Sequence, residues 1–278
     1  MPKKDMTAGE VLCTYLKRNI LDEGIWPNLT VALSSTGRGE QWVEFVEEVV
    51  ATQLTGRLVT AGKSIAENLG GLATVGGLQF KQQLYDITTE TMLASLEKTA
   101  KSKLTNLVER AVLATYGNVS DADKKILRGE VGRNPRCYLC NQMLEMRLDT
   151  EPSDEHRKRA VEYEHVWPRA FGGNTEIENL ALSCHDCNQR KANFANWAMV
   201  DIQSLVLGFN PSGNALEKIP GLRRFAMLSY AAHRMASKES LSLKAAHLRL
   251  QNRVAVPRVQ RTADVADFFN LLGHTESN

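Results

Sequence analysis

Two pairs of cysteines constrain this chain of 278 residues more strongly than any other sequence feature. Cys137 and Cys140 are separated by two residues, and Cys184 and Cys187 repeat that spacing. One tight turn can present two thiolates in this way, and two such turns make the tetrahedral four-sulfur set that suits structural zinc. Four reduced cysteines in an apolar core, the alternative, would leave the paired spacing unexplained. We therefore predict a zinc ion held by all four cysteines, with no open position for a catalytic water.

The segment between the two pairs, residues 141–183, is longer than in simple zinc fingers and should carry structure of its own. Within it, VEYEHV (161–166) alternates apolar and polar residues, as a short strand does. After a loop that contains glycine, NLALS (179–183) predicts a second strand, and HDCNQRKANFANWAMV (185–200) predicts a helix. The cysteines would thus clip together a small ββα unit.

The rest of the chain is predicted to be helical. In TAGEVLCTYLKRNI, Thr7 and Glu10 fit a capping box ahead of an apolar face. A second helix is expected in EQWVEFVEEVVATQL, where Gly56 would end it. A third is expected over roughly residues 87–116, where leucine and alanine repeat every three or four positions. Three further candidate helices follow, punctuated by prolines: residues 221–236, 239–253 and 262–272.

These patterns predict a mainly α fold with three parts. A helical N-terminal region (1–132) and a helical C-terminal region (201–278) flank the zinc-bound ββα unit (133–200). The C-terminal region carries ten basic and six acidic residues, a net charge of +4. This charge could contact phosphates, or it could belong to a solvated helical surface.

Composition and motifs exclude other classes of protein. The stretch GRLVTAGKS resembles a phosphate-binding P-loop, but five residues separate Gly56 from Gly62 where that motif needs four, so no nucleotide site is predicted. No run of eighteen apolar residues is present, so no transmembrane helix is expected. The start, MPKKDMTAGE, lacks the apolar core of a secretion signal. We expect a cytoplasmic protein whose cysteines are reduced and free to bind metal.

Four polar residues in or next to the cysteine-clipped segment offer hydrolytic chemistry: Glu164, His165, Asn179 and Asn188. A histidine near neutral pKa can deprotonate a water, and His165 ends a predicted strand. Carboxylate and amide oxygens are the ligands that Mg²⁺ or Mn²⁺ prefers, and Glu164 and Asn188 supply them. Because adjacent strand residues point to opposite faces, Glu164 and His165 need a bend at the strand end to converge.

Taken in this order, these residues resemble the HNH endonuclease family. The resemblance is carried by CYLC, EHVWPRAFGG, ENLALSC and CHDCNQRKAN, over roughly residues 133–197. It implies that His165 is the general base and that Asn179 braces the loop and orients the imidazole. It also implies that Glu164 and Asn188 are ligands of one catalytic metal. The chain departs from the family pattern at both ligands, where aspartate and histidine, respectively, are frequent.

Three basic residues flank this set and are candidates for binding phosphates: Arg169, Arg190 and Lys191. Lys191 has the strongest case, because the family usually has a basic residue at that position. His185, between the last two cysteines, is expected to be an exposed knuckle residue. Trp167 and Trp197 are expected to pack the small unit rather than to stack on bases.

The sequence therefore predicts a metal-dependent HNH endonuclease that hydrolyses DNA. One metal gives one cut, so a monomer should nick, and double-strand cutting would need an oligomer. The helical flanks suggest a homo-oligomer or a protein partner. The family resemblance implies a role in restriction, phage defence, homing or DNA packaging, and the sequence does not choose among them; a bacterial phage-defence effector is the preferred interpretation. Two alternatives stay open: a zinc-stabilised nucleic-acid-binding module without catalysis, and a scaffold in which the zinc unit only joins two helical regions.

Overall fold

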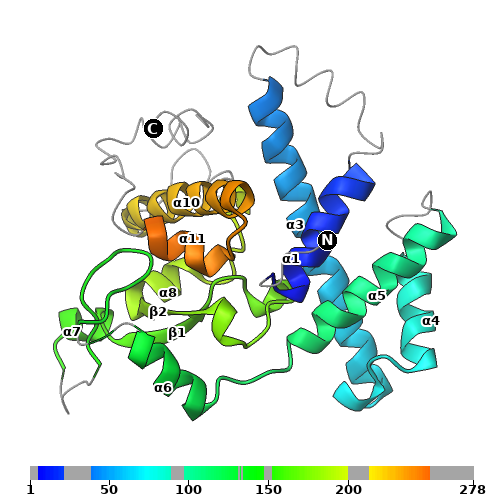
Figure 1. The fold of residues 1–278 in the computed structure, drawn as a ribbon, viewed down its shortest axis with the longest axis horizontal. Coiled ribbons are helices and arrows are strands. Elements are labelled where there is room, and N and C mark those ends of the chain that lie inside the picture. The colour runs from blue at the N-terminus through cyan, green and yellow to red at the C-terminus, as the bar shows by residue number, and fades with distance from the viewer. Residues whose placement is uncertain are drawn as a thin grey trace. The chain divides into compact units, whose positions relative to one another are not determined.

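The computed structural model describes residues 6–21, 39–88, 97–130, 132, 134–146, 152–199 and 213–250. Over these residues the protein is mainly helical and contains one small two-stranded sheet, as predicted (Figure 1). Its contacts group into two compact units. The first comprises Met1–Asn118 and Trp167–Thr175, and the second comprises Val119–Val166 and Glu176–Asn278. Most of the loop that joins the two strands thus packs with the N-terminal helices. The division of the chain into three regions, made from the sequence, remains a prediction.

The first unit is built from helices α1 (Ala8–Leu16), α3 (Gly39–Leu69), α4 (Leu78–Ile87) and α5 (Lys98–Ala114), with a π-helical turn, Lys17–Leu21, after α1. The predicted capping box is confirmed at the start of α1. The Thr7 hydroxyl accepts a hydrogen bond from the Glu10 amide at 3.1 Å, and the Glu10 carboxylate accepts one from the Thr7 amide at 2.9 Å. The fully buried core of the first unit is aliphatic and aromatic: Leu12, Leu16, Leu58, Val59, Phe80, Leu84, Leu104 and Val108.

Helix α3 does not end at Gly56, so that prediction is wrong. The helix continues through Gly56 and Gly62 to Leu69. A Cβ at Gly56 would lie 2.7 Å from Cε1 of Phe171, and one at Gly62 would lie 2.5 Å from Cγ2 of Val112. The two glycines therefore serve close packing inside the helix rather than its termination. The stretch that resembles a P-loop is part of this helix.

The loop between the strands has a shape that only glycine permits at two points. It contains the 3-10 turn η4 (Arg169–Phe171) and then Gly172, whose φ of 80° is left-handed. A Cβ at Gly173 would lie 1.9 Å from the carbonyl oxygen of Trp167. The loop is tied to α1 because the Gly9 amide donates to the Gly172 carbonyl at 2.9 Å. Its shape therefore depends on contacts within the first unit.

The second unit contains the predicted ββα element. Strand β1 (Val161–His165) pairs antiparallel with β2 (Leu180–Cys184), so that His165 lies opposite Leu180. Helix α8 (His185–Lys191) follows β2 directly and contacts both strands. The helix is shorter than predicted because it ends at Ala192, whose φ is 45°. The remaining elements are α6 (Asp121–Glu130), α7 (Asp154–Lys158), the 3-10 turn η5 (Ile177–Asn179), α10 (Gly213–Glu239) and α11 (Leu243–Leu250).

Helices α10 and α11 pack against each other, and α10 also contacts α8. Pro220 does not mark the start of α10, because the helix begins at Gly213 and includes the proline. Trp197 is buried against Tyr230 of α10, with ring centroids 5.0 Å apart, so its predicted packing role is confirmed. The expected helix at 262–272 lies outside the described residues. Across the described residues, no helix combines the length and the apolar character needed to cross a bilayer.

Candidate active site and zinc centre

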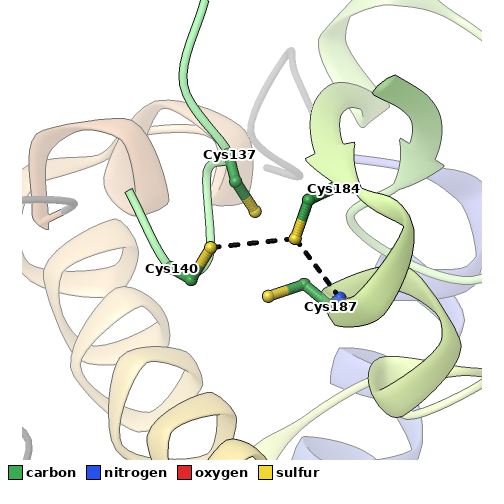
Figure 2. A group of neighbouring side chains, drawn as sticks. All are labelled: Cys137, Cys140, Cys184 and Cys187. Atoms are coloured by element: carbon green, nitrogen blue, oxygen red, sulfur yellow. Dashed lines mark hydrogen bonds between the residues drawn. The ribbon is translucent and has the colours of Figure 1, made fainter. Parts of the chain in front are cut away.

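The four paired cysteines converge in the second unit (Figure 2). Their Sγ atoms all lie within 4.8 Å of one another, and those of Cys140 and Cys184 are 3.7 Å apart. A tetrahedral zinc with Zn–S bonds of about 2.3 Å separates its sulfur ligands by about 3.8 Å. The arrangement of the thiols therefore fits a zinc ion bound by all four.

Each cysteine pair lies on a turn that backbone hydrogen bonds hold in place. In the first, the Asn141 amide donates to the Cys137 carbonyl at 2.9 Å, and Asn141 has a φ of 60°. The Tyr138 amide donates to the Leu182 carbonyl at 3.0 Å, which ties this turn to β2. In the second, the Cys184 sulfur caps α8 by accepting a bond from the Cys187 amide at 3.4 Å. A bound zinc would thus lock the corner between β2 and α8.

The electrostatics of the cluster also favour a cation. Hydrogen bonds from neighbouring thiols, Cys140 first, lower the pKa of Cys137. Hydrogen bonding to Cys137 and Cys140 raises the pKa of Cys184 and of Cys187. The pKa of Cys140 is lowered as well, so thiolates form readily at the first pair and are opposed at the second, and a divalent cation removes that opposition. The fifth cysteine, Cys13, belongs to the first unit, where burial raises its pKa to about 12.

Two glutamates of β1 contact α8, and each has its own partners. Glu162 Oε1 lies 2.5 Å from Nδ1 of His185, and the Asn188 side-chain amide donates to Glu162 Oε2. One helical turn further, the Lys191 ammonium donates to Glu164 Oε1 at 2.6 Å. Residues two apart on a strand share a face, and residues three apart on a helix are neighbours. The two carboxylates of β1 therefore lie opposite two side chains of α8: Glu162 opposite Asn188, and Glu164 opposite Lys191.

The environment of Lys191 differs from the solvent-exposed one expected for a phosphate ligand. Its side chain is 1% exposed, and its ammonium also donates to the His165 carbonyl at 2.9 Å. Burial lowers the pKa of Lys191, and the neighbouring Glu164 carboxylate opposes that shift. Burial likewise raises the pKa of Glu164, against the effect of Lys191. This buried pair joins the end of α8 to the end of β1.

His165 ends β1 and is half-buried. The strand alternation assigns it to the face of Tyr163, opposite to that of Glu162 and Glu164. Tyr163 contacts α6, because its hydroxyl accepts a bond from Arg128 Nε at 2.5 Å. Strand β1 stays paired with β2 through His165, which lies opposite Leu180, and Lys191 connects the Glu164 carboxylate to the His165 carbonyl.

Asn179 is buried at the start of β2 and contacts the segment that follows His165. Its carbonyl accepts a hydrogen bond from the Val166 amide at 2.8 Å. The backbone of His165 is therefore fixed on one side by Lys191 and on the other by Asn179. This contact uses the backbone carbonyl of Asn179, and the bracing role of its side chain stays a prediction.

The other two candidate phosphate ligands have accessible guanidinium groups that are partly engaged. Arg169 is exposed, and two of its guanidinium nitrogens donate to the Thr115 carbonyl, the Nε at 3.0 Å. Arg190 is half-exposed and pairs with Asp186 on the same helix at 3.0 Å. Exposed ion pairs such as the one between Arg190 and Asp186 are weak, so a phosphate can compete for Arg190.

Sequence reasoning did not select Glu162, and it treated His185 only as a knuckle residue. A signal for both was present in the spacing. Glu162 precedes Glu164 by two positions, so that both carboxylates share one face of a strand. His185 precedes Asn188 by three positions, so that both side chains share one face of a helix.

A comparison with models of protein families matches residues 137–201 to a model described as HNH endonuclease. The matched range begins at the first paired cysteine and includes β1, β2 and α8. Comparisons with curated proteins and with solved structures give no match. The match, the ββα order and the four clustered thiols agree with one another. Residues 137–201 of this chain therefore match the HNH endonuclease family and contain a four-cysteine cluster whose geometry fits a metal ion.

Proposed function

We propose that this chain is a divalent-metal-dependent endonuclease that hydrolyses phosphodiester bonds in DNA. The observation that carries the proposal is the HNH domain, in which a histidine ends β1 and an asparagine on α8 faces a carboxylate of the same strand. A base, an oxygen-rich ligand set and accessible cationic groups are the parts that phosphodiester hydrolysis needs. The proposal assigns all three to residues of the domain.

In this proposal His165 is the general base that takes a proton from the attacking water. The hydrogen bonds from Lys191 to the His165 carbonyl and from Val166 to the Asn179 carbonyl hold the strand end, which supports a fixed imidazole. Arg169 and Arg190 would bind phosphates of the substrate.

The proposed cofactors have separate roles. Zinc bound by the four cysteines would hold β2 and α8 together and so position Asn188. Asn188, with a carboxylate of β1, would hold one Mg²⁺ or Mn²⁺ ion, and the family resemblance implies Glu164 as that carboxylate. Such an ion, when bound, neutralises charge on the phosphate and on the departing 3′ oxygen.

A single site of this kind cuts one strand, so we propose that a monomer nicks DNA and that an oligomer makes double-strand cuts. The helical flanks would supply the contacts for self-association or for a protein partner. A cytoplasmic role in bacterial defence against phage is the biological setting proposed on the basis of the family resemblance.

The test is an assay on supercoiled plasmid with Mg²⁺ or Mn²⁺, comparing wild type, His165→Ala and an EDTA control. His156→Ala is a matched control, because His156 is a partly exposed histidine of α7 in the same unit. The proposal expects metal-dependent nicking that is lost in His165→Ala and kept in His156→Ala.

Two other outcomes identify the alternatives. DNA binding that is insensitive to Mg²⁺ and unchanged by His165→Ala, without any cutting, would identify a non-catalytic nucleic-acid-binding module. Absence of DNA binding even at low salt, where phosphate contacts are strongest, would identify a scaffold.

A further inference from the structure

The two glutamates of β1 that contact α8 differ in the charge already beside them. Glu164 has an ammonium 2.6 Å away, and the side chains of Lys191 and Glu164 are only 1% and 11% exposed. This carboxylate is neutralised and shielded. A hydrated divalent ion that approached Glu164 would meet the positive charge of Lys191 and would have to lose most of its water.

Among the residues that the structure describes, no lysine or arginine pairs with Glu162. Its contacts are the imidazole of His185 and the side-chain amide of Asn188, and neither carries a fixed positive charge. The side chains of Glu162 and His185 are 27% and 47% exposed. Water and ions therefore reach this carboxylate.

The three side chains that meet at Glu162 form a suitable donor set. A carboxylate, an imidazole and an amide offer two kinds of oxygen and one nitrogen, which suits Mn²⁺ and related divalent ions. The Asn188 amide now donates from Nδ2, and a half-turn of the amide about its last side-chain bond would present Oδ1 instead. With three protein ligands, a six-coordinate ion keeps positions for water and for a phosphate oxygen.

From these contacts we propose that Glu162, His185 and Asn188 form the divalent-cation site of the domain. Glu164 is instead the buried partner of Lys191, and this pair positions the carbonyl of His165. The inference deepens the proposed nuclease function, and it assigns the ligand role to a different carboxylate from the one that the family resemblance implies.

The test measures binding of Mn²⁺ to the zinc-loaded full-length protein by calorimetry, without DNA. Glu162→Gln and Glu164→Gln are matched variants, because each removes one carboxylate charge from the same face of β1. The proposal expects Glu162→Gln and Asn188→Ala to weaken Mn²⁺ binding roughly tenfold or more. Glu164→Gln should leave Mn²⁺ binding within about threefold of wild type.

Glu164→Gln leaves Lys191 buried without its carboxylate, so the double variant Glu164→Gln with Lys191→Met is included to keep the site neutral. Zinc content and circular dichroism establish that each variant is folded. Electron spin-echo spectroscopy of bound Mn²⁺ gives an independent readout. It should detect an imidazole nitrogen in wild type and lose that signal in His185→Ala.

The inference is overturned if the double variant loses Mn²⁺ binding while Glu162→Gln binds as wild type does. Because binding is measured without DNA, this result is separate from the plasmid assay. A protein that binds Mn²⁺ through Glu162 but never cuts DNA would retain the cation site and refute the nuclease function. A protein that cuts DNA but binds Mn²⁺ through Glu164 would retain the nuclease function and refute the cation site at Glu162.

Discussion

The ammonium of Lys191 bridges the Glu164 carboxylate, at 2.6 Å, and the carbonyl of His165, at 2.9 Å. One buried side chain of α8 thereby fixes both the last carboxylate of β1 and the backbone of the candidate base. A buried ion pair contributes little net stability, but loss of one partner leaves an uncompensated buried charge. The pair is therefore best tested by removing its members singly and together.

We expect Lys191→Met to lower the free energy of unfolding by about 3–5 kcal/mol, because Glu164 is then buried without a partner. The double variant with Glu164→Gln should recover most of that loss. Urea denaturation of the three zinc-loaded proteins measures both effects. A Lys191→Met protein as stable as wild type would mean that the ammonium is not buried against Glu164 in solution.

Much of the second unit follows from local sequence signals. The paired cysteines fix where two turns must meet, and the alternation in VEYEHV and the run NLALS give strands within a residue of β1 and β2. These features depend on spacing along the chain, which a sequence displays directly. The same is true of the capping box of Thr7 and Glu10.

The features that the sequence did not reveal depend on contacts between distant segments. Gly56 is expected to end a helix unless Phe171 is known to occupy the space beside it. Lys191 is expected to face solvent unless β1 is known to place Glu164 beneath it. Burial of a charged side chain is decided by its tertiary partner, and no local pattern encodes that partner.

Removal of zinc should unfold the ββα element. Zinc bound by small cysteine-rich units contributes roughly 10–16 kcal/mol of apparent binding free energy, which exceeds the stability of such a unit alone. We expect Cys140→Ser to lower the zinc content well below one ion per chain and to reduce the ordered signal in circular dichroism.

Cys13→Ala is the matched control for zinc binding, because Cys13 is a buried cysteine of the first unit and lies outside the four-thiol cluster. It should retain the wild-type zinc content, measured by mass spectrometry of the metal. Equal zinc content in wild type and Cys140→Ser would contradict a four-thiolate site.

Gly9 should tolerate no side chain. A Cβ there would lie 1.9 Å from the Phe171 carbonyl oxygen, in the contact between α1 and the loop that joins the strands. We expect Gly9→Ala to lower the free energy of unfolding by about 2–3 kcal/mol. Gly129→Ala is the control, because a Cβ there meets nothing within 4 Å and Gly129 lies in α6.

Gly129→Ala should be neutral or stabilising by up to about 1 kcal/mol, since alanine favours the helix. Thermal denaturation of both variants decides the point. If Gly9→Ala and Gly129→Ala melted at the same temperature, the loop that joins β1 and β2 would not contact α1 at Gly9 as described.

Acid should destabilise the second unit through His247 of α11. This histidine is buried, with its ring edge-on to Tyr138 at a centroid distance of 5.5 Å. Burial lowers its pKa to about 3, and the nearby His233 and Lys191 add to that shift. In the unfolded chain its pKa returns to about 6.5. Between these two values the unfolded state binds a proton that the folded state does not, so stability falls as pH falls.

For His247 alone, the free energy of unfolding should drop by about 2 kcal/mol from pH 7 to pH 5. His247→Phe keeps a ring against Tyr138 and removes the titrating group, so its stability should change less over this range. His156→Gln, at a partly exposed site, should follow wild type. Urea denaturation at each pH, with zinc content measured alongside, separates this effect from loss of metal. Parallel pH profiles for wild type and His247→Phe would show that His247 is not buried as a neutral imidazole.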